Sequence, residues 1–251
     1  MPRGADIITF LDSYLEKEKF TDYLPIGLLV EGRDEVRRAA TGVSACAEVF
    51  EQAVAWNADM IVVHHGMFWD SADRVVRGSL KKRLKLLLDN DVTLLGYHLP
   101  LDAHPEIGNN ILFARAAGFQ NPEPFGEYKG NKIGFRGRLE PIPIEEFAAA
   151  AEGVYGAAPR AFRHGEAVIE SAAVISGGAW EHTEEAWREG VDCFVTGAAD
   201  EPVFHLAREL ETNFLAFGHH ATEKPGVRRL GELIAGKFGV ETRFFDVENP
   251  L

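Results

Sequence analysis

The stretch Met60-Ile61-Val62-Val63-His64-His65-Gly66 places two histidines directly after a short apolar run. Such a run is typical of a buried strand, and the glycine marks the point where the strand is expected to end. Adjacent side chains of a regular strand point to opposite faces of the sheet. Two neighbouring imidazoles can therefore serve one site only if the strand ends there, and Gly66 is expected to supply the conformational freedom for that turn.

Two further apolar runs each lead into a histidine that is followed four residues later by a carboxylate. They are Leu94-Leu95-Gly96-Tyr97 before His98 and Asp102, and Phe214-Leu215-Ala216-Phe217-Gly218 before His219 and Glu223. Open α/β sheets keep their sites beyond the carboxyl ends of the strands, and imidazole is a common metal ligand. The three runs together therefore predict a metal site at strand ends.

The two halves of the chain share one pattern. The first half reads Thr41-Gly42, a helix, a strand and then His64-His65-Gly66, whereas the second reads Ser176-Gly177, a helix, a strand and then Thr196-Gly197-Ala198. Each half then adds a helix, a strand and the histidine–carboxylate pair. We therefore predict an α/β fold of two duplicated modules related by pseudo-twofold symmetry, with the metal site in the cleft between them.

The expected module boundaries follow from composition. Residues 121–165 hold five prolines and several glycines, so we expect a connector there, between a first module at 1–120 and a second at 166–251, which could pack as one domain. Expected strands are 26–30, 36–40, 60–64, 92–97, 133–139, 160–163, 172–176, 192–196, 214–217 and 241–245. Expected helices are 6–18, 44–55 with Ser44 as its cap, 80–88, 108–117, 144–154, 181–189, 202–210 and 225–238.

Composition limits the class of protein. The chain has 251 residues, of which 46% are hydrophobic and 26% charged, as is usual for a globular protein. The net charge of −13 argues against nucleic acid as the main partner, because gripping phosphates needs a basic surface. There is no apolar run of the roughly 20 residues that span a bilayer, so no membrane partner is expected. Two cysteines and no recognisable signal peptide favour a cytoplasmic location.

The candidate metal ligands are His64, His65, Asp102, His219 and Glu223. Three imidazoles and two carboxylates exceed the needs of one tetrahedral ion and suit two divalent ions about 3.5–4 Å apart. Nitrogen and oxygen donors without thiolate fit Zn, Mn, Fe, Co or Ni. Glu223 is the expected bridge between the ions. Asp102 follows Pro100 and is expected in a loop rather than on a helix surface.

His98 is the candidate catalytic residue, and its role stays open between three alternatives. It could bind metal, it could orient Asp102 or a water, or it could carry a proton, since the pKa of histidine lies near neutrality. We predict that it is not an equal ligand, because a third imidazole from the same half would crowd out the position that a reacting water needs.

The combination of motifs resembles the NGG-interacting-factor-three-like family, which is also called GTP cyclohydrolase I type 2-like or dinuclear metal centre proteins. The motifs are Val62-Val63-His64-His65-Gly66, Tyr97-His98-Leu99-Pro100-Leu101-Asp102, Val174-Ile175-Ser176-Gly177-Gly178-Ala179 and Gly218-His219-His220-Ala221-Thr222-Glu223. The resemblance covers nearly the whole chain and is to the short form. It implies a duplicated α/β fold, a toroidal homo-hexamer and a dinuclear site on the same five ligands.

Two functions compete at this point. The first is a metal-dependent hydrolase of a small substrate, such as a nucleotide or heterocycle, and the resemblance favours a GTP cyclohydrolase-like reaction. The second is a non-catalytic toroidal scaffold that stores or senses metal or docks protein partners. A general acid or base beyond the ligands would separate the two, and His98 is the candidate for that role.

Overall fold

The computed structural model describes residues 1–71, 73 and 75–251. The chain forms two compact units, which are described separately. Unit 1 comprises Met1–Leu101 and Gly226–Glu248, and unit 2 comprises Asp102–Pro225 and Asn249–Leu251. The chain passes from one unit to the other within helix α4 (Leu99–Ala103) and returns within helix α10 (Lys224–Phe238). This division differs from the expected 1–120, 121–165 and 166–251.

Unit 1 is built on a five-stranded sheet with the order β1-β4-β3-β2-β11. Its strands are β1 (Gly27–Val30), β2 (Arg38–Ser44), β3 (Met60–His65), β4 (Thr93–Gly96) and β11 (Glu241–Phe244). All neighbours are parallel except β1, which runs antiparallel to β4. Because β2, β3 and β4 run the same way, their carboxyl ends meet at one edge of the sheet, where the sequence places the histidines.

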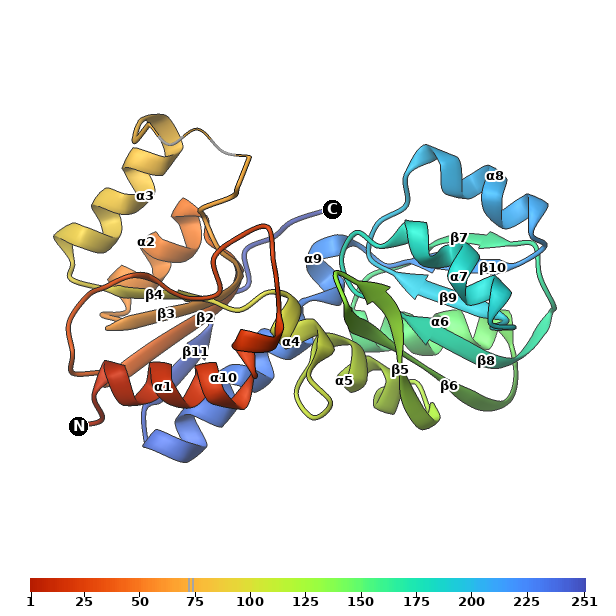
Figure 1. The fold of residues 1–251 in the computed structure, drawn as a ribbon, viewed down its shortest axis with the longest axis horizontal. Coiled ribbons are helices and arrows are strands. Elements are labelled where there is room, and N and C mark those ends of the chain that lie inside the picture. Colours follow the sequence, from red (N-terminus) through yellow and green to blue (C-terminus); the bar gives the residue numbers. More distant parts are fainter. Residues whose placement is uncertain (72, 74) are drawn as a thin grey trace. The chain divides into compact units, whose positions relative to one another are not determined.

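Helices cover both faces of this sheet. They are α1 (Gly4–Tyr14), α2 (Ala47–Ala55), α3 (Gly78–Asp89) and the part of α10 that begins at Gly226. In Figure 1, α2 and α3 lie on one face of the sheet, and α1 and α10 lie on the other. The apolar strands are buried on both faces, and Phe50 and Leu87 from the helices join Ile61 and Val63 in one core cluster. This explains why the strands read as continuous apolar runs.

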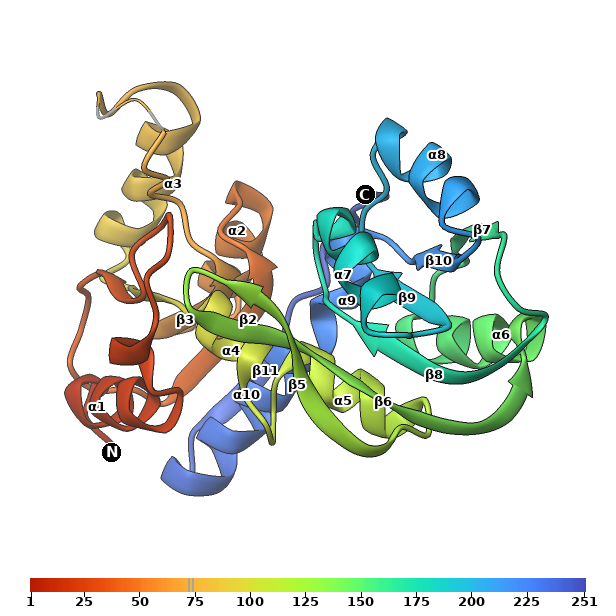
Figure 2. The same ribbon diagram turned by 45° about the vertical axis from the view of Figure 1, so that its right-hand side comes forward.

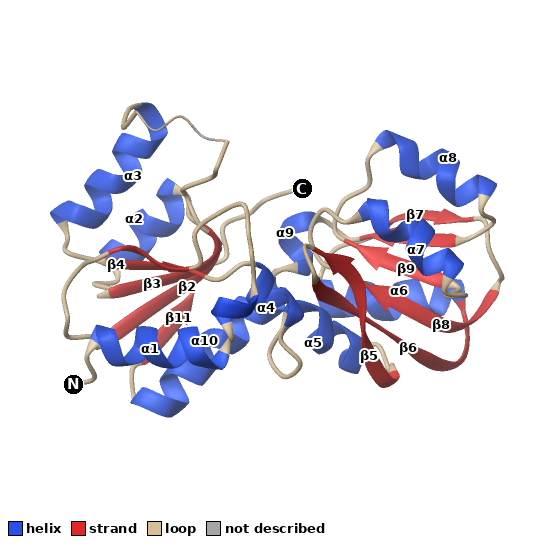
Figure 3. Cartoon of the chain, viewed as in Figure 1, coloured by secondary structure: helices blue, strands red, loops and turns tan. Residues whose placement is uncertain are grey.

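Unit 2 is built on a six-stranded sheet with the order β5-β6-β8-β9-β10-β7. Its strands are β5 (Gln120–Tyr128), β6 (Asn131–Pro143), β7 (Arg160–Arg163), β8 (Val168–Val174), β9 (Cys193–Thr196) and β10 (Asn213–Ala216). Its helices are α5 (Asn109–Ala116), α6 (Ile144–Tyr155), α7 (Thr183–Arg188), α8 (Glu201–Glu209) and the short α9 (His219–Thr222). Figure 3 shows the helices on both faces of this sheet as well.

The internal duplication is confirmed by the order of elements. The series α1-β1-β2-α2-β3-α3-β4 in unit 1 corresponds to α6-β7-β8-α7-β9-α8-β10 in unit 2. In both units the last three strands of the series are parallel, and the first strand pairs antiparallel with the last. The units differ at the other sheet edge, which β11 forms in unit 1 and the antiparallel pair β5–β6 forms in unit 2. The predicted α/β fold with an internal duplication is therefore confirmed.

The expected connector at 121–165 is instead part of the second sheet. Strands β5 and β6 form a long antiparallel hairpin, which Figure 2 shows as the extended green pair along unit 2. The sequence predicted β6, α6 and β7 but not β5, because the prolines and acids of β5 are unusual within a strand. An edge strand tolerates them, since one side makes no ladder hydrogen bonds.

Two further differences concern the ends of elements in unit 1. Ser44 is the last residue of β2 rather than a helix cap, and α2 begins at Ala47 after Cys46. The helix expected at 6–18 ends at Tyr14 and is followed by one 3₁₀ turn at Lys17–Lys19. Of the helices in the described part of the chain, none is both long and apolar enough to cross a membrane.

Candidate metal centre

The two neighbouring histidines of unit 1 do reach the same region. β3 ends at His65, and the ring centroids of His64 and His65 lie 4.7 Å apart. Gly66 follows the end of the strand as expected, but it is not among the glycines with a positive φ. Its role is to be small, because a Cβ at this position would lie 2.8 Å from Cδ1 of Leu29, and a Cβ at Gly96 would lie 2.9 Å from the same atom.

Both histidines are oriented through Nδ1. Nδ1 of His64 donates to the backbone carbonyl of Tyr97 at 3.0 Å, and Nδ1 of His65 lies 3.2 Å from the hydroxyl of Ser44. Because a carbonyl can only accept, the proton of neutral His64 is on Nδ1, and Nε2 carries the lone pair. One ring nitrogen of each histidine is thus oriented by the protein, as is usual for histidines that bind metals.

The support for His64 extends one step further. The hydroxyl of Tyr97 donates to Asp12 at 2.7 Å, and Asp12 forms an ion pair with Lys17. Burial of the Tyr97 phenol, together with its hydrogen bond to Asp12, raises its pKa well above the usual value, so it stays a donor. The carbonyl that orients His64 thus belongs to Tyr97, whose side chain is fixed by Asp12 and whose backbone N–H donates to Val63.

His98 joins the same cluster. One ligand atom of each of His64, His65 and His98 lies within 4.8 Å of the others. However, Nδ1 of His98 lies 2.9 Å from a carboxylate oxygen of Asp22, and Nε2 lies 3.3 Å from the hydroxyl of Tyr23. Both ring nitrogens therefore already have protein partners, which favours a supporting role over an equal ligand role. The exclusion of His98 from the ligands stays a prediction.

Asp22 was not predicted to belong to the site. Its side chain is fully buried and also accepts a hydrogen bond from the backbone N–H of Leu99. Burial raises the pKa of the Asp22 carboxyl, but the hydrogen bond and charge interaction with His98, together with backbone N–H donors, lower it below its usual value. The ionised Asp22 accepts a hydrogen bond from the Nδ1–H of His98. No local pattern in the sequence indicates this pair, because 76 residues separate its members.

In unit 2, Asp102 is held through one of its two oxygens. Oδ1 accepts hydrogen bonds from the hydroxyl of Ser176 at 2.8 Å and from the side-chain amide of Asn109 at 2.9 Å. Asp102 lies in the short helix α4 rather than in the expected loop, because Pro100 occupies the first turn, where proline is tolerated. These two donors fix the carboxylate through Oδ1.

His219 and Glu223 lie together at the ends of α9. Nε2 of His219 is 3.1 Å from Oε1 of Glu223, and the glutamate side chain is only 2% exposed. Gly177, at the turn after β8, explains how they fit, because a Cβ there would lie 2.5 Å from Oε1 of Glu223 and 3.2 Å from Nε2 of His219. Its φ of +71° also favours glycine.

The turn after β8 links the donors of unit 2. Ser176 contacts Asp102, and the next residue, Gly177, borders His219 and Glu223. The turn itself is fixed, since the N–H of Gly177 donates to the hydroxyl of Thr222 at 3.0 Å. The sequence motif contained Ser176 and Gly177, but no role was predicted for either. Each unit thus gathers three of the six candidate residues: His64, His65 and His98 in unit 1, and Asp102, His219 and Glu223 in unit 2.

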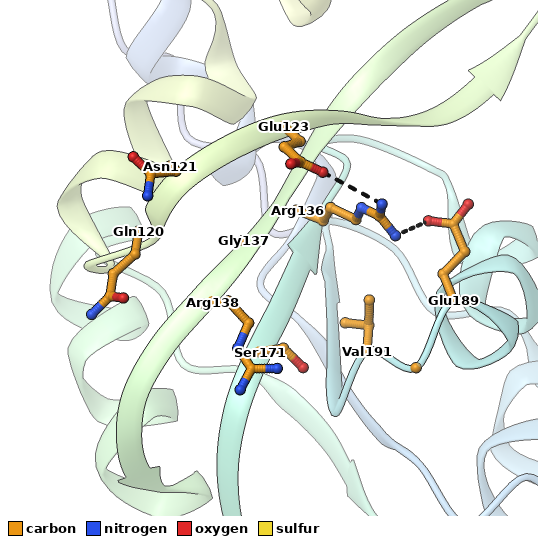
Figure 4. A pocket seen from close by; sticks show the side chains of 10 residues that line it. Gln120, Asn121, Glu123, Arg136, Gly137, Arg138, Ser171, Glu189 and Val191 are labelled. Atoms are coloured by element: carbon orange, nitrogen blue, oxygen red, sulfur yellow. Dashed lines mark hydrogen bonds and ion pairs between the residues drawn. The ribbon is translucent and has the colours of Figure 1, made fainter.

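The cavity drawn in Figure 4 is a separate feature of unit 2. It has a volume of about 410 Å³ and lies over β5, β6 and β8 beside the end of α7. Arg136 lines it and is paired with Glu189 at 2.5 Å and with Glu123 at 3.4 Å. None of the candidate ligands lines this cavity.

The comparisons with known proteins extend over the whole chain. The family model Duf34/NIF3 (NGG1p interacting factor 3) matches residues 2–250. The chain is 42% identical over 247 residues to the GTP cyclohydrolase 1 type 2 homolog of Pseudomonas aeruginosa, covering 98% of each chain. It is 40% identical over 256 residues to the protein of the same name from Yersinia pestis, covering 99% of each.

Solved structures agree with this assignment. Protein ybgI, described as of unknown function, has a TM-score of 0.94 and 37% identity, over 99% of this chain and 100% of that chain. TTHA1606 from Thermus thermophilus has a TM-score of 0.91 and 30% identity, over 99% and 100%. These findings confirm the resemblance noted in the sequence. The chain belongs to the Duf34/NIF3 family.

Proposed function

We propose that this protein binds two divalent metal ions and acts as a metal-dependent hydrolase of a small substrate. The residues that would hold the ions are His64 and His65 of unit 1 and Asp102, His219 and Glu223 of unit 2. Glu223 would be the ligand shared by the two ions. The bound ions would polarise the bond to be cleaved and lower the pKa of a water molecule.

One observation carries the proposal: three of these side chains are each oriented by hydrogen bonds to one of their two possible donor atoms. Nδ1 of His64 and Nδ1 of His65 have oxygen partners, and Oδ1 of Asp102 has two donors. Orienting partners of this kind are typical of metal ligands. The small residue Gly177 beside His219 and Glu223 also fits, since it leaves room at the donor atoms. The donor set therefore suits Zn, Mn, Fe, Co or Ni.

His98 is the residue of this chain that would move a proton. Asp22 holds the proton on Nδ1, so Nε2 is the atom that accepts or returns a proton during the reaction. The hydroxyl of Tyr23 contacts this Nε2 at 3.3 Å and stabilises the ring orientation. Because His98 is a proton-transfer group in addition to the proposed ligands, it favours catalysis over a purely structural scaffold.

The substrate class and the assembly rest on similarity. Relatives at about 40% identity are named GTP cyclohydrolase 1 type 2 homologs, which supports a nucleotide or related heterocycle as substrate. The proposed assembly is the homo-hexameric toroid that the sequence resemblance implies.

The test is a hydrolysis screen of purified protein against nucleotides and phosphoesters, with each of the five metals in turn. Glu223→Ala should abolish any activity found, whereas Glu232→Ala, an exposed acid on α10, should retain it. Equal activity in Glu223→Ala and the parent would contradict the proposal. Full metal occupancy without turnover of any tested compound would favour the scaffold.

A further inference from the structure

An exposed tryptophan lies beside the histidines of unit 1. The ring centroid of Trp69 is 6.1 Å from that of His65, and the two planes are inclined by 37°. Trp69 also stacks on Tyr23 at 5.4 Å with an interplanar angle of 23°. Although large apolar side chains are usually buried, Trp69 is 38% exposed. The edge of the candidate centre thus carries an accessible aromatic surface.

The indole is held in place by its neighbours in sequence. Met67 is buried, and Phe68 packs against the core of unit 1. These two residues attach the loop that carries Trp69 to the core. The backbone N–H of Asp70 donates to the carbonyl of Tyr23 at 3.0 Å. The ring of Trp69 therefore stacks on Tyr23, and the backbone of the next residue, Asp70, is hydrogen-bonded to Tyr23. A surface fixed in this way binds a ligand without a large ordering cost.

Tyr23 links this aromatic surface to the residue proposed to move a proton. Its ring packs edge-on against His98 with centroids 5.1 Å apart, and its hydroxyl contacts Nε2 of His98. The indole of Trp69 lies close to the rings of both His65 and Tyr23. A molecule resting on Trp69 would therefore lie next to both a metal ligand and His98.

We propose that Trp69 is the stacking surface for a planar aromatic or heteroaromatic ring of the substrate. This inference rests on the proposed function and adds to it the feature of the substrate that is recognised. Stacked rings have centroids about 4.5–7 Å apart. Because the ring centroids of His65 and Trp69 lie 6.1 Å apart, a ring stacked on Trp69 would lie beside this candidate ligand. The reacting bond would then belong to the ring or to a group attached directly to it.

Stacking and net charge together limit the kind of molecule that carries this ring. Stacking is tolerant of ring type, because every planar ring has a π face. The chain charge of −13 disfavours a long polyanion. A free heterocycle or a single nucleoside or nucleotide therefore fits this surface better than a nucleic acid strand.

The test compares two metal-binding probes that differ only in their ring. Benzohydroxamate and cyclohexanecarbohydroxamate share the same chelating group, but only the first has a planar ring. We expect the zinc-loaded protein to bind benzohydroxamate more tightly in calorimetry, by between about 5-fold and 150-fold. Trp69→Ala should remove this preference without changing the zinc content, and Trp69→Phe should restore much of it.

Trp187→Ala is the matched control, because Trp187 is 46% exposed and lies on α7 of unit 2. It should leave the preference unchanged. Equal binding of the two hydroxamates to the parent protein would overturn this inference while leaving the metal centre intact. Binding of neither probe to protein that contains zinc would overturn both this inference and the proposed function. A preference that persists in Trp69→Ala would assign ring recognition to another part of the protein.

Discussion

The ligands are expected to contribute unequally, because only one of them is proposed to touch both ions. Glu223 is almost fully buried and lies against His219. We predict that Glu223→Ala removes both ions, whereas His219→Ala mainly weakens one. Elemental analysis of protein reloaded with Mn or Zn measures this, starting from about two ions per parent chain. Full occupancy of both positions in Glu223→Ala would show that another residue bridges.

Gly177 is the small residue on which the fit of unit 2 depends. We predict that Gly177→Ala lowers metal affinity by about 10–100-fold, because the added Cβ would push Glu223 and His219 from their positions. Gly156→Ala is the control, since Gly156 has nearly the same φ of +70° but nothing within 4 Å of an added Cβ. Both variants should lose about 1–2 kcal/mol of stability from the left-handed backbone. Equal metal affinity in the two would mean that Glu223 adjusts freely.

The role of His98 can be separated from that of a ligand. We predict that His98→Gln keeps nearly all the metal while lowering any hydrolytic rate by about 10²–10⁴, the usual contribution of a general acid or base. Asp22→Asn should lower the rate by less, because it leaves the imidazole present but no longer fixes its Nδ1 proton. Loss of one ion in His98→Gln would make His98 a ligand, and full activity would make it structural.

At the scale of elements, the carboxyl ends of two parallel strands, β3 and β4, carry the histidines of unit 1, and packing keeps these ends close. Gly66 and Gly96 both lie against Cδ1 of Leu29 on β1. We predict that Gly66→Ala destabilises the protein by about 1 kcal/mol, the low end for overpacking, because the atom that must move is the end of the half-buried Leu29 side chain. Adding Leu29→Ala should recover part of that loss. Denaturant unfolding of both variants measures it, and no recovery in the double variant would show that Gly66 is required for another reason.

The sequence predicted those features of the structure that depend on neighbouring residues, and it missed those that depend on contacts between distant residues. Apolar periodicity and capping are local, so the repeated strand–helix pattern and the five candidate ligands could be identified from spacing alone. The orienting partners could not, because Asp22 and Ser176 reach His98 and Asp102 across 76 and 74 residues. Ser44 shows the same limit: a serine before a helix predicts a cap, but strand pairing places it opposite His65 instead. Strand β5 was not predicted because its prolines and acidic residues are unusual in a strand, although an edge strand tolerates them.

At the scale of the whole molecule, the duplication explains why the donor sets are unequal. Each unit ends a βαβαβ series in a short helix, α4 after β4 and α9 after β10. The histidine pair after β3 has no counterpart after β9, where Thr196-Gly197 stands, and Thr196 donates to the carbonyl of Gly177. One copy thus supplies imidazoles at this strand end, and the other uses the same place to fix the turn beside Glu223.

The proposed assembly gives a direct mass prediction. A homo-hexamer has a mass of about 166 kDa, which is six times the 27.7 kDa chain. Closed symmetric assemblies are the usual form of homo-oligomers. Light scattering on the metal-loaded protein at micromolar concentration checks this prediction. A monomer or dimer under those conditions would contradict the toroid.

Metal removal should lower the stability of the whole chain, because the proposed ligands come from both units. Ions that bind only the folded state stabilise it in proportion to the logarithm of their concentration over Kd, about 2.7 kcal/mol at 100 times Kd. We therefore expect a chelator to lower Tm of the parent protein and readdition of Zn or Mn to restore it. Glu223→Ala should already melt at a lower temperature and should respond little to the chelator. If the chelator acts equally on both proteins, its effect does not arise from this centre. If it lowers Tm only in the parent, the ions that stabilise the fold are those that Glu223 holds.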